Sequence, residues 1–380
     1  GNLKEARNTF SKCLDDPMLS EFSDLEQQIR SLSILIDIGE LKKPDLDALD
    51  ALTSDLRWLE KQESEYSYEA YQLAMESIAR LFFNQNGEQH NGHSILALAC
   101  KFDYPDFRYQ AHFLPLESII ELISKKETSP FESFIVGKAP HSLEDFYEML
   151  GTVRMFEGNV EGAVEAFSQL DEDYQSYGYR NFVMDDNPFE FWDPGYSEHD
   201  PLEAVVYKKK DLAEIMLGLE QKIQSDKSNQ FDHLMQLGTA WYNMTYWGNA
   251  WEAVAYGRST SGIFPDDMEK AESIGKRMFK ANPYMLPSLQ ATNYSRPKSY
   301  FLKALNATKN REDKARVMWL LSLCDQHEQG WNRTDTEPGK GSYFDELYAE
   351  YGNTSFYHEI ILDCAYFRNY WDMPPLDRYR

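Results

Sequence analysis

Apolar residues recur at three- and four-residue spacings along most of this chain, and this period constrains its fold more than any other feature. The stripes are Leu25, Ile29, Leu32 and Ile36 in residues 24–45, and Tyr68, Leu73, Ile78 and Leu81 in residues 66–83. Such spacing places side chains on one face of an α-helix, whereas a half-buried strand alternates every second residue. Because clean alternation is almost absent, we expect an all-α protein with roughly two thirds helix and under about 5% strand, against a usual helix content of about one third.

The chain is 380 residues long, which is more than one ordinary hydrophobic core accommodates. Helical segments over such a length form separate domains or an array of helix pairs. We expect an N-terminal helical region of unassigned class in residues 1–139. Residues 140–380 are expected to form a helical repeat region, with an aromatic and acidic loop at 171–200.

Small and turn-forming residues in 146–170 have the spacing of two helices joined by a turn. The residues concerned are Tyr147, Leu150, Gly151, Gly158, Asn159, Ala163 and Phe167. A glycine at position 151 lets a neighbouring helix approach closely, and Gly158-Asn159 suits a left-handed turn. We therefore expect Gly151 to lie at a helix crossing, with Phe167 filling the space beyond.

The same spacing recurs further along the chain, as an array of repeats would require. The second copy, residues 234–259, has Leu234, Leu237, Gly238 and Trp241 in its first helix, then Gly248, Asn249 and Ala253. Residues 271–283 form a partial third copy, and residues 299–326 read as two helices joined by a polar turn. Gly238 is accordingly expected at a second helix crossing.

Residues 140–326 resemble tetratricopeptide-like helical repeat proteins and are similar to a group of uncharacterised exported bacterial repeat proteins. The shared segments, in order, are "NPF", the helix from Lys210 to Glu220, "YNMTYWGN" and the "KAL…KAR…LLSLCD" pair. The resemblance covers about half of the chain. Arg154 stands where the repeat has tyrosine and the final proline is absent, so the unit is degenerate. The resemblance implies a right-handed α-solenoid and an exported protein, periplasmic or at the cell surface, with a cytoplasmic location as the alternative.

The net charge of the chain disfavours two classes of partner, nucleic acids and anionic membranes. The formal net charge is −25, and such a surface repels nucleic acid phosphates and anionic lipid headgroups. The three lysines at 208–210 point around most of a helix, so we interpret them as a solvated face. The sequence contains no run of about 20 apolar residues, which is the length that a membrane-spanning helix needs.

The sequence contains no motif that indicates catalytic residues, a cofactor or a metal. His90 and His93 share a turn, but no third ligand lies near them, and zinc needs three or four. The cysteines are scattered without the spacing of a metal or redox motif. We therefore assign no catalytic, cofactor-binding or metal residue.

Residues 181–200 combine aromatic rings with acids and prolines and follow no helical or strand period. We interpret this segment as an ordered loop packed on the helices, with a ligand-contacting loop as the alternative. A second aromatic group surrounds residues 241–256, where burial between repeats is weighed against a stacking surface. The candidate binding residues are Phe189, Phe191, Trp192, Tyr196, Trp241, Trp247 and Trp251.

These patterns favour a non-enzymatic binding or scaffolding protein that uses a groove of a helical repeat array. The expected partner is a protein or peptide, whose identity the sequence leaves open, and a carbohydrate is the alternative ligand. The competing hypothesis is an all-α carbohydrate-active enzyme with carboxylates and tryptophans in a cleft, because paired acids can hydrolyse glycosidic bonds.

Overall fold

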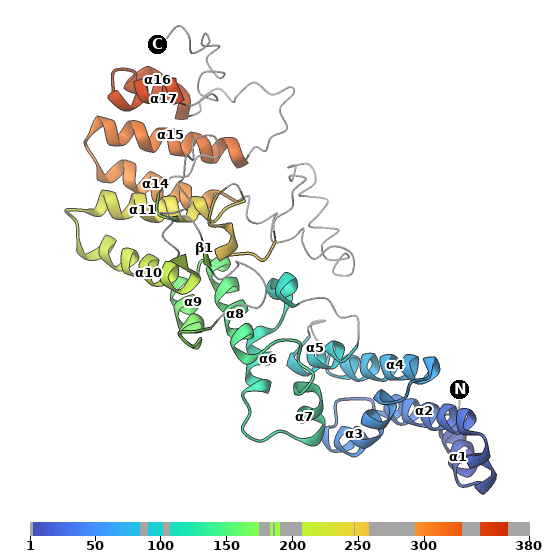
Figure 1. Cartoon of the computed structure of the whole chain (residues 1–380). Helices are drawn as coiled ribbons and strands as arrows, with labels where there is room; N and C mark the ends of the chain where they lie inside the picture. The colour runs from blue at the N-terminus through green and yellow to red at the C-terminus, as the bar shows by residue number, and fades with distance from the viewer. Residues whose placement is uncertain are drawn as a thin grey trace, which may run out of the picture. The chain divides into compact units, whose positions relative to one another are not determined.

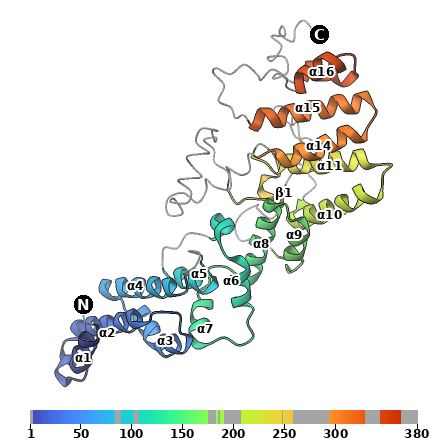
Figure 2. The same cartoon turned by 180° about the vertical axis from the view of Figure 1, so that it is seen from behind.

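The computed structural model describes most of the chain as helices (Figures 1 and 2). The described residues are 3–83, 90–101, 107–174, 183–184, 187–190, 207–246, 248–257, 293–328 and 343–363. They belong to two compact units, residues 1–150 and 151–380. The expected boundary after residue 139 lies in the connection before a helix, whereas the units divide within that helix. The all-α prediction is confirmed, and none of the described helices is long and apolar enough to cross a membrane.

The first unit is built from short and medium helices that follow one another closely. They are α1 (Leu3–Leu14), η1 (Pro17–Glu21), α2 (Ser23–Glu40), α3 (Leu46–Glu60), α4 (Glu65–Leu81), α5 (Gly92–Ala99), η2 (Phe107–Phe113), α6 (Leu116–Ile123), α7 (Pro130–Val136) and the start of α8 (Leu143–Glu157). Side-chain caps set several beginnings, because Asp45, Ser64 and Asn91 each accept a hydrogen bond from a backbone N–H in the first turn. Pro44 therefore precedes the cap of α3 and lies outside that helix.

The buried faces of α2 and α4 match the predicted stripes only in part. Ile29, Ile36 and Ile78 are buried as predicted, whereas Leu25, Tyr68 and Leu73 are exposed. The buried face of α4 also includes small residues such as Ala74. Both faces of these helices carry apolar residues, so the period alone does not say which one packs. In α4 the buried face is the one that carries alanines, which allow a closer approach of the neighbouring helix.

The second unit is a series of helices in which each packs on the next. They are α9 (Val160–Phe167), α10 (Lys209–Ser225), α11 (Gln230–Asn243), η4 (Trp251–Ala253), α14 (Ser295–Ala307), α15 (Arg311–Glu328), α16 (Tyr343–Tyr351) and α17 (Ser355–Asp363). Helix α9 contacts α10, α10 contacts α11, α11 contacts α14, and α14 contacts α15. Figure 1 shows α10, α11, α14 and α15 as successive layers. The helix pair expected in residues 299–326 is thus confirmed as α14 and α15.

Two glycines lie where the sequence placed helix crossings. A Cβ on Gly151 would lie 2.3 Å from the ring of Phe167, and one on Gly238 would lie 2.5 Å from the ring of Phe301. Real Cβ atoms do not approach rings so closely, so both positions require the absence of a side chain. Phe167 and Phe301 are fully buried, and the two predicted close approaches are confirmed.

The prediction of a second helix after Gly248 is wrong. Residues 251–253 form only the 3₁₀ turn η4, and α11 packs instead on α14. The Ala250 N–H donates to the Asn243 carbonyl, 2.8 Å away, and Gly248 lies directly against the Asn243 backbone. The chain thus folds back over the end of α11, a path that no helical continuation allows. The third partial copy at 271–283 lies outside the described residues.

Candidate functional site

A small antiparallel ribbon joins two stretches of chain on either side of most of the aromatic and acidic residues. Strand β1 (Val183–Met184) pairs with β2 (Tyr207–Lys208), with Val183 opposite Lys208 and Met184 opposite Tyr207. Helix α10 follows directly at Lys209. The ribbon therefore brings together the two ends of the connection formed by residues 185–206.

A turn at residues 187–190 is tied down inside this connection. The Phe189 N–H donates to Asn187 Oδ1 at 3.0 Å, and Asn187 Nδ2 donates to Glu190 Oε1 at 2.8 Å. An asparagine side chain that accepts from the backbone two residues on is a common turn former. Asn187 and Pro188 therefore begin a turn, as Asn-Pro pairs commonly do.

The turn is held onto the helices by Asn243, the last residue of α11. Its Nδ2 donates to the carbonyls of Pro188, at 3.0 Å, and Glu190, at 2.7 Å. Asn243 is fully buried, and a buried side-chain amide that satisfies two backbone carbonyls fixes their position firmly. Asn243 was not among the predicted site residues, although it begins the "NMTYWGN" segment that the sequence singled out.

The predicted aromatic residues divide into three groups. Phe189 is half-buried, with its ring edge on Tyr207 and the centroids 6.2 Å apart. Trp241 is buried in the helical core, and Trp251 is half-buried at the start of η4. The candidate residues outside the described part of the chain are Phe191, Trp192, Tyr196 and Trp247.

Trp241 is held beneath a cation. The Arg296 guanidinium lies 4.4 Å from the centre of its ring and donates to the carbonyls of Phe156, at 3.2 Å, and Glu157, at 2.8 Å, at the end of α8. Gly158 follows with φ +80°, a left-handed backbone in which a Cβ would lie 2.3 Å from that guanidinium. The turn before α9, the indole and α14 are thus locked together, which gives α11 a rigid environment.

A packed aromatic group surrounds Thr245, two residues after Asn243 in the chain. Thr245 Oγ1 donates to the Tyr242 carbonyl, at 2.6 Å, and accepts from the Tyr294 hydroxyl, at 2.9 Å. The rings of Tyr242 and Tyr294 lie 5.7 Å apart, and His327 stacks on Tyr294 at 5.6 Å. This arrangement supports the end of α11 from the side of α14 and α15.

The interpretation of all three lysines at 208–210 as a solvated face is wrong for the middle one. Lys209 is fully buried, and its Nζ donates to Thr152 Oγ1 at 3.0 Å and lies 4.5 Å from the centre of the Tyr256 ring. The Tyr256 hydroxyl also donates to Thr152 Oγ1, at 3.2 Å. Burial of an ammonium is costly unless it is hydrogen-bonded, and these contacts join the start of α10 to α8 and the segment after η4.

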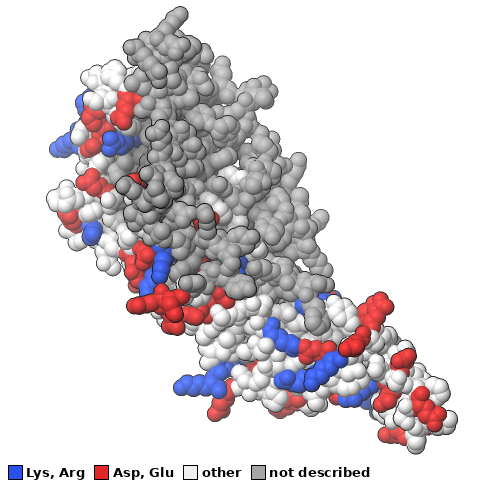
Figure 3. Space-filling view, in the orientation of Figure 1, with Lys and Arg blue, Asp and Glu red and all other residues white. Residues whose placement is uncertain are grey.

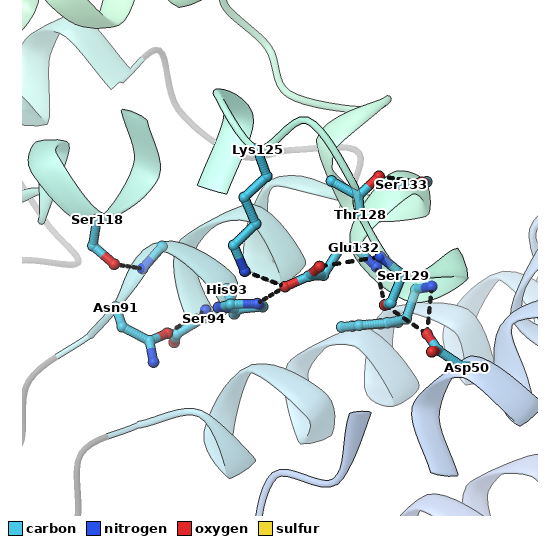
Figure 4. A network of polar contacts seen from close by, with 12 residues as sticks. Asp50, Asn91, His93, Ser94, Ser118, Lys125, Thr128, Ser129, Glu132 and Ser133 are labelled. Carbon is cyan, nitrogen blue, oxygen red and sulfur yellow. Dashed lines mark hydrogen bonds and ion pairs between the residues drawn. The ribbon is translucent and has the colours of Figure 1, made fainter. Parts of the chain in front are cut away.

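A second polar network lies in the first unit, where the sequence offered the histidine turn (Figure 4). Glu132 is buried and accepts hydrogen bonds from His93 Nε2 and Lys125 Nζ, both at 2.8 Å, and from the Ser129 N–H at 3.1 Å. Burial opposes its ionisation, but these donors lower the pKa of Glu132 to about 2. Asp50 accepts from the Ser129 hydroxyl and thereby joins α3 to the start of α7.

The two histidines of this turn have structural contacts. His93 stacks on Phe82 with centroids 4.7 Å apart, and His90 Nδ1 lies 2.6 Å from Ser94 Oγ. Burial lowers the pKa of His90. Within the described residues, no group of three or more His, Cys, Asp or Glu side chains could hold a metal ion.

Comparison with known proteins gives no match: no family model, no curated protein and no solved structure resembles this chain significantly.

Proposed function

We propose that the protein is a non-enzymatic binding protein that presents the connection between β1 and β2 to a protein or peptide partner. The main support for this proposal is the contact made by Asn243. Its side chain is buried at the end of α11 and donates hydrogen bonds to two carbonyls of the 187–190 turn. The ribbon holds the ends of the same connection. Binding residues on loops work best when a rigid scaffold positions those loops.

Anchoring of this kind lowers the free-energy cost of binding. Bringing the ends of a loop together costs entropy, and so does ordering its side chains when a partner arrives. In the free protein the ribbon already holds the ends of the loop together, so binding does not require loop closure. The turn held by Asn243 is also ordered already, which lowers the entropy lost when a partner binds. The sequence between the anchors contains Phe191, Trp192 and Tyr196, and aromatic residues contribute most of the binding energy at many protein interfaces.

We further propose that the helical region is a degenerate tetratricopeptide-like array and that the protein is exported. Support for the array comes from the consecutive packing of helices in the second unit and from the ring that fills the space beside each of Gly151 and Gly238. Support for export comes from the sequence resemblance alone.

A display experiment on the full chain tests the binding function. A random peptide library is selected on the parent protein, and the affinities of the enriched peptides are measured for the parent and for Trp192→Ala. We expect enriched peptides whose affinity falls at least tenfold in Trp192→Ala, while the melting temperature stays within about 2 °C. Phe22→Ala is the matched control, because Phe22 is an exposed aromatic residue in the first unit.

Two results would contradict the proposal. Enriched peptides that bind Trp192→Ala and the parent equally would show that the connection is not the binding element. An oligosaccharide array that gives Trp192-dependent binding, followed by hydrolysis of the bound sugar, would favour the carbohydrate-active alternative.

A further inference from the structure

A small hollow in the first unit lies between the end of α3 and the first half of α4. It is lined by Leu59, Glu60, Gln62, Tyr68 and Tyr71 and has a volume of about 280 Å³. Pockets that enclose drug-sized ligands span about 300–1,000 Å³. This one therefore has room for a single side chain of a partner.

The floor of the hollow is rigid and its rim is open. Leu59 and Tyr71 are 0% and 1% exposed, whereas Tyr68 is 41% exposed. Burial, together with Cys100 and Glu60, raises the pKa of Tyr71, so its phenol is uncharged at neutral pH. The exposed lining is mostly apolar, and two of its members are aromatic rings.

One carboxylate belongs to this lining. Glu60 Oε1 pairs with Lys138, and Glu60 Oε2 forms no hydrogen bond with any described residue. The same stretch contains the exposed acids Glu63, Glu65 and Glu69, against the single base Lys61. The hollow thus combines apolar walls, two aromatic rings and one ion-paired carboxylate, and exposed acids outnumber bases in the adjoining stretch of the chain.

We propose that this hollow binds an arginine side chain of a basic peptide segment. An apolar stem fits against Leu59 and the tyrosine rings, and a cation is attracted both by ring faces and by a carboxylate. A guanidinium is preferred to an ammonium, because it is planar, more weakly hydrated and able to form two parallel bonds with a carboxylate. The negative charge of the whole chain attracts such a peptide at long range. The inference concerns the first unit and does not depend on the function proposed for the second.

The test uses the full chain labelled with 3-fluorotyrosine, in which the fluorine resonance of Tyr68 is assigned from its loss in Tyr68→Phe. The chain is titrated with a capped peptide that has one arginine among glycine and serine residues. Matched peptides carry citrulline, which has the same shape without the charge, or norleucine. We expect the arginine peptide to shift the Tyr68 resonance to saturation, with at least tenfold weaker binding of both neutral peptides.

Variants define the site. Titrations of the variants follow all tyrosine resonances of the labelled chain. Tyr68→Ala is expected to weaken binding of the arginine peptide at least fivefold, while Tyr68→Phe retains it because the ring remains. Leu73→Ala, a substitution at another exposed residue of α4, is the control and should leave binding unchanged. Glu60→Gln should bring the arginine affinity to the citrulline value; if that variant does not fold, the two Tyr68 variants decide alone.

Four outcomes would overturn the inference. Equal binding of the arginine and norleucine peptides would make the hollow a purely apolar one. Equal affinity for agmatine, a free guanidinium compound, would assign it to a small molecule and not to a peptide. Unchanged arginine binding in Tyr68→Ala, or no saturable binding at all, would place no such site here.

Discussion

At the scale of single residues, the anchor at Asn243 decides how the connection between β1 and β2 is held. Its two hydrogen bonds run to backbone carbonyls that lie more than fifty residues earlier in the chain. A periodic pattern contains no information about such a contact, because the pairing depends on a fold-back after the helix end. Asparagine at a helix end is also common for local reasons, so the residue type alone indicates nothing unusual.

Replacing Asn243 should loosen this connection. Asn243→Ala leaves two carbonyls without their donor and should lower the free energy of unfolding by roughly 1–3 kcal/mol. Asn243→Asp also removes the donors and should cost at least as much, because it places a carboxylate against two carbonyl oxygens. Chemical denaturation gives the stability, and limited proteolysis should show faster cleavage within residues 185–206.

Asn306→Ala is the control for this experiment. Asn306 donates to a carbonyl of its own helix on an exposed face, so its loss should change neither the denaturation midpoint nor the digestion pattern. Cleavage within 185–206 that is unchanged in Asn243→Ala would contradict the anchoring role.

The lowered pKa of the buried carboxylate Glu132 predicts how the stability of the fold depends on pH. Its folded pKa, about 2, lies below the ordinary value of 4.5, so the stability that it contributes is present above about pH 4.5. That contribution is lost as the pH falls from about 4.5 toward 2, because the folded state must then take up a proton that the unfolded state already holds. Glu132→Gln should therefore be less stable than the parent at pH 6, and the difference should shrink on acidification.

Denaturation curves between pH 6 and pH 2.5 measure this difference. Glu161→Gln removes an exposed carboxylate in the second unit and controls for the change in net charge. A Glu132→Gln variant whose stability deficit stays constant down to pH 2.5 would show that the network in Figure 4 does not hold the carboxylate ionised.

At the scale of helices, the sequence predicted which segments are helical better than which faces pack. The positions of α2, α4, α8, α14 and α15 follow the predicted segments. The predicted faces of α2 and α4 are correct only in part, because apolar residues lie on both faces of each helix and only some of the predicted ones are buried. The helix expected after Gly248 failed because a backbone hydrogen bond to Asn243 bends the chain.

The contact between Gly238 and Phe301 gives a quantitative prediction for a helix pair. Gly238→Ala places a Cβ where the ring lies, and overpacking of a core usually costs about 1–3 kcal/mol. A smaller side chain at position 301 should recover part of that loss, so Gly238→Ala with Phe301→Leu should be less destabilised than the sum of the single variants. Urea denaturation of the four proteins measures this coupling.

Gly218→Ala is the matched control, since nothing lies within 4 Å of a Cβ at that position of α10. It should stabilise the protein by roughly 0.5–1 kcal/mol, because alanine favours a helix over glycine. A Gly238→Ala variant that is stabilised to the same extent would contradict the close packing of α11 on α14.

At the scale of the whole molecule, charge is the property that the sequence predicts most directly. Acidic and basic side chains are both scattered over the described surface in the view of Figure 3, and in places several acidic side chains lie together. Lys209 shows the limit of such reasoning, because one of three adjacent lysines is fully buried. Helical rotation separates neighbours in sequence by about 100°, so residue type alone does not reveal which of them faces the core.

The net charge of −25 predicts that nucleic acid does not bind. Long-range repulsion opposes the encounter with a polyanion, and it is only partly screened at about 0.15 M salt. A gel-shift assay with duplex DNA and single-stranded RNA should show no complex at micromolar protein. A complex that dissociates as salt increases would instead reveal a basic surface.

The proposed function requires that the connection anchored by Asn243 binds a partner. The most direct measurement is isothermal titration of one library-selected peptide into the parent, Trp192→Ala and Phe22→Ala, with thermal melts of all three. We predict that Trp192→Ala loses at least tenfold in affinity at an unchanged melting temperature, while Phe22→Ala binds as the parent does. Parental affinity in Trp192→Ala, or a lowered melting temperature that accounts for the loss, would contradict the claim and leave this residue with a structural role.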